Sequence, residues 1–149
     1  LAVKLGFSNV NLVSLDVDKA LEHAEFLRKK FFGINFILMQ DAELTLQPCN
    51  GDLLLNVVPA EQASFLEAIS YLNFLRKDGL VVDMPFSLKQ SLLVQESKNT
   101  DIACVLPAEI QALRDYEILQ RLAVQGLPAK SEYLSLWRDF LNQDKGPVT

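Results

Sequence analysis

The 149 residues are half hydrophobic and carry a net charge of −5, with 14 Lys and Arg against 19 Asp and Glu. This length and composition predict a single folded domain with a packed core and exclude a largely disordered chain. The acidic balance argues against nucleic-acid binding, and the lack of 18 consecutive apolar residues argues against a membrane span. We assign the domain to residues 1–143 and expect 144–149 to form a flexible tail.

The first third of the chain predicts strands on either side of one helix. Residues 10–15 have the apolar character of a strand, which we expect to pair with residues 2–7. A helix follows from Val17 to about Phe31, because a short carboxylate stands ready to cap it and apolar side chains recur at helical spacing. Residues 34–39 then predict another strand.

The next segment predicts a β-hairpin. Residues 43–47 alternate polar and apolar side chains, and residues 53–58 are again apolar. Between them lies Asn50-Gly51, a pair that tolerates the positive φ of a tight turn. Pro59 suits the first turn of a second helix, which we expect to continue to Asp78-Gly79.

The last part of the chain predicts more strands and then a helical hairpin. Residues 91–95 admit two interpretations, a helix opened by a capping box at Ser87 and Gln90 or a strand, and we favour the strand. The remaining expected elements are strands at 80–84 and 102–106 and helices at 107–125 and 129–142. The chain is therefore expected to be α+β, with mainly antiparallel strands, about four helices and a C-terminal helical hairpin.

The chain also repeats part of itself at an offset of 48 residues. The tetrapeptide at 26–29, Phe-Leu-Arg-Lys, recurs at 74–77, and Pro-Ala-Glu at 59–61 recurs at 107–109. One interpretation is internal duplication, which predicts that 17–58 and 65–106 superpose as related substructures. The other is convergence, since helices tend to begin and end with the same residue types.

No pattern in the chain predicts a catalytic, cofactor-binding or metal-binding residue. His23 is the single histidine, and it has no second ligand at metal-binding spacing. Cys49 and Cys104 predict two free thiols in a reducing compartment, with one long-range bridge as the alternative. No glycine-rich phosphate loop occurs. Four isolated acids are interpreted as ordinary turn residues: Asp41, Asp52, Asp83 and Asp101.

Aromatic side chains provide the candidate interface. Phe26 and Phe74 occupy equivalent places in the repeat, on helix faces that are otherwise charged, and Tyr133 and Trp137 belong to an aromatic stripe on the last helix. Such residues favour a protein–protein contact within a homo-oligomer. The alternative is that other elements of the same domain cover them, and we favour this alternative for most of the stripe on the last helix.

The order helix, three strands, helix, strands and helix over residues 17–125, in a small acidic chain, resembles the chaperones that serve type III secretion systems. The resemblance implies an acidic α+β homodimer that holds a protein partner in an extended form, without a cofactor. No motif of that family is matched, so no functional residue is carried over. The first residues are too short and mixed for a signal peptide, and we expect a cytoplasmic protein. A domain that binds a small ligand, and an enzyme that uses scattered carboxylates, are the alternatives.

Overall fold

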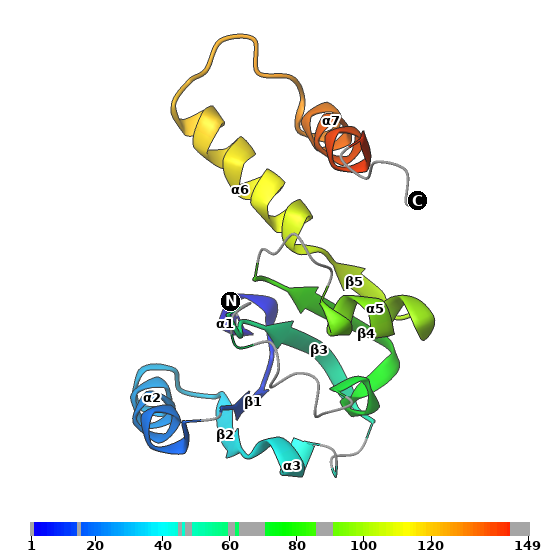
Figure 1. The fold of residues 1–149 in the computed structure, drawn as a ribbon. Coiled ribbons are helices and arrows are strands. Elements are labelled where there is room, and N and C mark those ends of the chain that lie inside the picture. The colour runs from blue at the N-terminus through cyan, green and yellow to red at the C-terminus, as the bar shows by residue number, and fades with distance from the viewer. Residues whose placement is uncertain are drawn as a thin grey trace.

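The computed structural model describes residues 2–14, 16–44, 46, 49–59, 62, 71–85 and 91–143. Its elements follow the chain as α1 (Ala2–Leu5), β1 (Asn9–Val13), α2 (Val17–Lys30), β2 (Asn35–Met39), α3 (Asp41–Leu44), β3 (Gly51–Asn56), the 3-10 helix η2 (Tyr71–Phe74), β4 (Leu75–Asp83), α5 (Leu92–Asn99), β5 (Ala103–Val105), α6 (Pro107–Arg121) and α7 (Lys130–Gln143) (Figure 1).

The first unit is a β-α-β unit with two parallel strands. Asp16 caps α2, because its side chain accepts a hydrogen bond from the backbone N–H of Lys19 at 3.1 Å. The helix crosses back so that β1 pairs with β2 in parallel. Arg28 fixes α2 to this sheet, since its guanidinium donates twice to the carbonyl of Phe36, at 3.0 and 2.6 Å.

The second sheet has three parallel strands in the order β3-β4-β5. Its middle strand, β4, has neighbours on both sides, and α5 connects β4 to β5. The buried core gathers around this strand and joins residues from α3, β4 and α5: Leu44, Leu75, Val81 and Leu93. Burial of each such side chain contributes about 1.5–3 kcal/mol, so this cluster stabilises the packing of α3 and α5 on β4.

The last two helices form a hairpin that lies beyond the strands (Figure 1). Pro107 begins α6, and the Glu109 carboxylate accepts from the N–H of Leu106 at 3.3 Å. The rings of Tyr116 and Tyr133 join α6 to α7, with centroids 5.3 Å apart. The expected C-terminal hairpin of helices is therefore confirmed.

The expectation of mainly antiparallel strands is wrong, because every pair of described strands is parallel. The error lies in the interpretation of Asn50-Gly51 as a hairpin turn. Gly51 begins β3, and a Cβ at this position would overlap the ring of Phe74. The glycine therefore permits close approach of that ring, and the strand continues to a parallel neighbour instead of turning back.

Three local expectations are also wrong. Residues 2–5 form a helix instead of a strand paired with β1, and residues 41–44 form the helix α3 where the first strand of the hairpin was expected. Residues 92–99 form α5 instead of a strand. Ser91 explains the last case, since its hydroxyl accepts from the N–H of Val94 at 3.2 Å and caps the helix.

The two copies of the repeated tetrapeptide have different structures. The first copy, at 26–29, belongs to α2. In the second copy, Phe74 ends η2 and residues 75–77 begin β4, which continues through Gly79 to Asp83. The repeated tetrapeptide therefore does not adopt one structure in both places. Residues 60–61 and 63–70 of the helix expected after Pro59 lie outside the described residues, as do 144–149. The expected end of that helix is wrong, because residues 71–74 form η2 and residues 75–79 belong to β4.

Four helices of eight residues or more are present in the described part of the chain: α2, α5, α6 and α7. None of the described helices is both long enough and apolar enough to cross a lipid bilayer.

Candidate functional site

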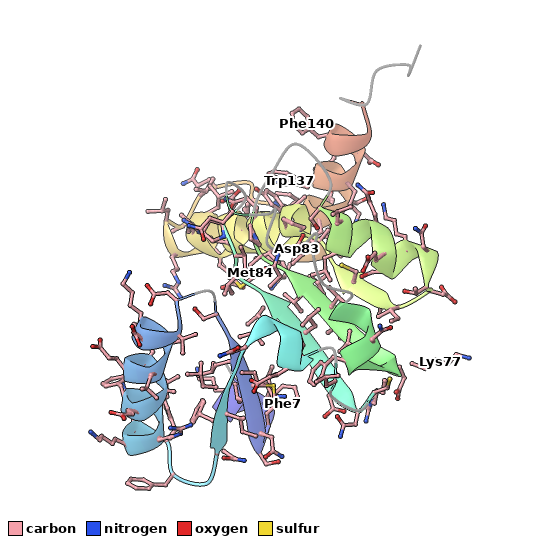
Figure 2. The ribbon with its side chains drawn as sticks, turned by 60° about the horizontal axis from the view of Figure 1, so that its bottom comes forward. Phe7, Lys77, Asp83, Met84, Trp137 and Phe140 are labelled. Carbon is pink, nitrogen blue, oxygen red and sulfur yellow. The ribbon has the colours of Figure 1, made fainter. Side chains whose placement is uncertain are left out.

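An apolar groove lies between the two sheets. Its volume is about 820 Å³, and its walls come from β1, from the inner side of α2 and from β3. Phe7, labelled in Figure 2, lies at this boundary between the sheets. His23 and Leu27 face the groove from α2, and Leu93 contributes from α5. Its size and its mainly apolar walls make the groove the first candidate for a binding site.

The position of His23 gives it no charged partner in the described structure. Its side chain is exposed on α2, and its Nδ1 lies 2.8 Å from the carbonyl oxygen of Lys19, one helical turn earlier. No three His, Cys, Asp or Glu side chains come together as a metal site among the described residues. The chemistry of the groove therefore rests on its apolar walls and on the backbone of the strands that border it.

A second feature is a buried polar cluster where the parallel strands end. Asp83, the last residue of β4, is 1% exposed. Its carboxylate accepts from the Asn56 amide at the end of β3 and from the Ser91 hydroxyl at the start of α5, both at 2.6 Å. Figure 2 shows Asp83 at this end of the sheet, next to Met84. The cluster connects three elements at the carboxyl ends of the strands, where open parallel sheets commonly bind ligands.

Sequence reasoning missed this cluster because it treated Asp83 as a turn residue. The available signal was the apolar run of residues 80–82 directly before it. A carboxylate that ends a buried parallel strand stays inside the fold and needs hydrogen-bond donors. Asn56 and Ser91 supply those donors, and neither was singled out in the sequence.

Of the other acids that were singled out, Asp52 and Asp101 do not join this cluster, and the Asp41 side chain lies outside the described part of the structure. Asp52 lines the groove and pairs with Arg76 at 2.7 Å, while Arg76 also pairs with Asp78 at 2.9 Å. Asp101 adopts a positive φ of 58° after α5. Asp52 and Asp101 lie in separate places, so the described structure does not assemble a two-carboxylate centre from them.

The two cysteines are free. Cys49 is exposed, and its thiol donates to the carbonyl of Asn73 at 2.8 Å. Cys104 is half-buried in β5, where burial raises the pKa of its thiol. The nearby carboxylates of Asp83 and Glu109 raise the pKa further, whereas a hydrogen bond with Ser97 opposes the change.

The candidate interface residues occupy different environments. Phe26 is 58% exposed on α2, with the Lys30 ammonium 5.4 Å from its ring centroid. Phe74 instead packs against the buried core. Tyr133 joins α7 to α6 through its ring contact with Tyr116, and within α7 the Trp137 indole donates to the Tyr133 hydroxyl at 3.3 Å. Of the four, Phe26 has the most exposed position.

The helical hairpin carries apolar side chains that sequence reasoning did not select. Leu136 is 57% exposed and Phe140 is 62% exposed, and their i, i+4 spacing places them next to each other on α7. Figure 2 shows Phe140 pointing outward from α7. Ile118 on α6 and Leu122, the residue that follows α6, form a similar exposed pair. The signal in the sequence was the same spacing, which was attributed to packing within the domain.

Comparison with protein-family models and with curated proteins gives no match to this chain. The features of the described structure that bear on function are the groove, the buried cluster and the exposed apolar pairs.

Proposed function

We propose that this chain is a non-enzymatic protein-binding module that acts as a homodimer, in the manner of an adaptor or chaperone. The observation that carries the proposal is the exposed pair of Leu136 and Phe140 on α7. Large apolar side chains more than half exposed and adjacent on one helix favour burial against another protein. The helical hairpin lies beyond the strands, which leaves this face open to a partner (Figure 1).

The expected affinity follows from the number of side chains buried. Burial of a Leu or Phe side chain contributes about 1.5–3 kcal/mol, and a two-fold interface buries each of them twice. This contribution of roughly 6–12 kcal/mol is opposed by an association cost of about 4–15 kcal/mol. The two terms nearly cancel, so the homodimer reaches a micromolar dissociation constant only if neighbouring residues contribute about as much again.

Sedimentation of the wild type and of a Leu136→Ser, Phe140→Ser variant tests the proposal. The wild type is expected to dimerise, and the variant to be a folded monomer by circular dichroism. Phe32→Ser is the matched control, because Phe32 is 91% exposed but lies in the loop after α2. Phe26→Ser tests the second contact expected from the sequence. A monomeric wild type, or a double variant that stays dimeric, would refute the assignment of this surface.

A second candidate function is the binding of a small ligand, and the groove is the observation that favours it. Its volume of about 820 Å³ falls within the range of roughly 300–1,000 Å³ that small-molecule sites occupy. Fluorescence of an apolar dye such as 1-anilinonaphthalene-8-sulfonate, titrated with the folded protein, tests this alternative. Stoichiometric binding in the groove would support it, and the absence of binding to the folded protein would remove it.

A further inference from the structure

The two walls of the groove are the open edges of two strands. Among the described strands, β1 pairs with β2 alone, and β3 pairs with β4 on one side. Consecutive residues of both strands line the groove, 9–13 from β1 and 51–56 from β3. From β2, by contrast, alternate residues line it, Ile37 and Met39. When every second residue of a strand lines a groove, the groove lies over one face of that strand. When consecutive residues line it, the groove lies along the edge of the strand.

The hydrogen bonds identify which backbone groups of β1 point into the groove. The carbonyl of Ser8 accepts from the N–H of Asn35, at 2.8 Å, so the backbone of Ser8 faces β2. In a parallel ladder the N–H and C=O of successive residues point to opposite sides of the strand. Asn9, Asn11 and Val13 therefore direct their backbone groups toward the groove.

The hydrogen bonds of β3 identify in the same way which of its backbone groups point into the groove. The carbonyl of Asn56 accepts from the N–H of Met84 at 3.1 Å, so the backbone of Asn56 faces β4. The alternation then turns the backbone groups of Leu53 and Leu55 toward the groove. Two rows of hydrogen-bonding groups thus border one apolar space.

The volume matches a short strand. Each residue of a strand within packed sheets occupies about 160 Å³, from a rise of about 3.3 Å, a strand spacing of about 4.8 Å and a sheet spacing of about 10 Å. A groove of about 820 Å³ therefore accommodates roughly five residues. This length agrees with the five residues of β1 and the six of β3.

The charges define the chemistry of the occupant. Of the residues that line the groove, Asp52 and His23 are the ionisable ones, and Asp52 is already paired with Arg76. A charged segment would lose hydration without finding a complementary charge there. The β1 sequence, NVNLV, also lacks the Lys and Pro residues that block additional pairing at exposed strand edges. Charge complementarity thus favours an uncharged segment.

From these observations we infer that the groove binds an extended, uncharged segment of about five residues from a partner protein, which adds as a strand between β1 and β3. Strand addition gives affinity through backbone hydrogen bonds and selects alternate apolar side chains. The inference rests on the proposed protein-binding function and names the form in which the partner is held.

The probe is the peptide acetyl-KTVTVTVK-amide, whose terminal lysines provide solubility outside the central strand. Its affinity for the full chain is measured by isothermal titration calorimetry, together with that of a peptide carrying N-methyl groups on alternate central amides. N-methylation keeps the side chains and removes the donors. The expected result is binding that weakens at least about tenfold on N-methylation, since several backbone hydrogen bonds are lost.

Two variants at one position of β1 provide the matched control. Asn11→Pro removes an N–H that points into the groove and leaves the β1–β2 hydrogen bonds, so it is expected to weaken peptide binding by a similar factor. Asn11→Thr keeps the N–H and is expected to bind as the wild type does. Circular dichroism checks that both variants are folded, and the N-methyl comparison does not depend on either of them.

Absence of peptide binding at millimolar concentration, or equal binding of both peptides, would overturn the inference. Equal binding would identify the groove as an apolar site without strand addition. Sedimentation separates this failure from failure of the proposed function, because the dimer interface on α7 can persist while the peptide does not bind. A wild-type protein that neither dimerises nor binds the peptide would refute both the proposed function and the inference of strand addition.

Discussion

Asp83 shows how one side chain can connect several elements. Its carboxylate receives hydrogen bonds from Asn56 on β3 and from Ser91 at the start of α5, while its own backbone belongs to β4. A buried carboxylate is stable only when such donors surround it. Removal of the acid leaves both donors without their acceptor in a region closed to water.

We therefore expect Asp83→Ala to lower the free energy of unfolding by about 2–4 kcal/mol. Urea denaturation followed by circular dichroism measures the change. Asp78→Ala is the control, because Asp78 forms an exposed ion pair with Arg76 and is expected to have little effect. Unchanged stability in Asp83→Ala would mean that the cluster does not hold these elements together.

Cys104 supplies a prediction about pH. Burial raises the pKa of its thiol, so the thiolate that reacts with alkylating agents forms only in the alkaline range. The rate of Cys104 modification by iodoacetamide, followed by peptide mass spectrometry, is expected to keep rising with pH beyond the ordinary thiol pKa of about 8.5. The exposed Cys49 provides an internal reference for the reagent. A rate for Cys104 that levels off near that pH would contradict the prediction.

The sign of the linked stability change follows from the same shift. A thiol whose pKa is higher in the folded state than in the unfolded state binds its proton more tightly when folded. Its contribution to stability is complete below the unfolded pKa and is lost as the pH rises through the folded pKa. The effect therefore belongs to the alkaline range and leaves neutral pH unaffected.

At the scale of elements, the positions of the strands could be predicted from the sequence, but their pairing could not. Apolar runs located β1, β2, β5 and the second half of β4, because burial requires such runs in either kind of sheet, whereas residues 75–79 of β4 were expected to be helical. The direction of pairing depends on which distant strand lies alongside, and local sequence does not contain that information. The repeated tetrapeptide makes the same point, since it is helical in α2 and partly extended in β4.

The candidate site could also be predicted only in part from the sequence. The helix that presents Leu136 and Phe140 was predicted together with its boundaries, whereas their exposure depends on how the hairpin is placed. The groove could not be predicted, because it exists only where two sheets with open edges face each other. Gly51 was noticed for its turn propensity, although its role is to admit the Phe74 ring.

Hydrogen exchange tests the open edge of β1 directly. The amides of Asn11 and Val13 point into the groove and are expected to exchange faster than those of Val10 and Leu12, which face β2. Nuclear magnetic resonance at single-residue resolution can separate these neighbours. Equal protection of all four amides would show that the edge is already covered.

At the scale of the molecule, the helical hairpin and the strands are expected to respond differently to denaturant. The main contacts of α6 and α7 are with each other, and the core cluster lies at the larger sheet. Regions with few shared buried contacts open with different free energies. Trp137, the one tryptophan of the chain, reports on the hairpin alone.

We expect the fluorescence of Trp137 to change at a lower urea concentration than the circular dichroism signal of the whole chain. Tyr133→Ala should separate the two transitions further, because it removes the ring contact with Tyr116 and the acceptor for the Trp137 indole. Coincident transitions in both proteins would instead indicate one cooperative unit.

The parallel pairing also determines how the chain must reach its native state. Paired residues are separated by 23 to 27 positions along the chain, from Leu80 with Ala103 to Leu54 with Val81. None of the described strands is joined to its neighbour by a short turn. Each pairing must therefore close a long loop before its stabilising contacts can form. During synthesis β3 leaves the ribosome before β4, so the backbone N–H and C=O groups of β3 that pair with β4 stay unpaired until β4 has been made. Such a chain is expected to fold slowly and to need protection while it is still on the ribosome.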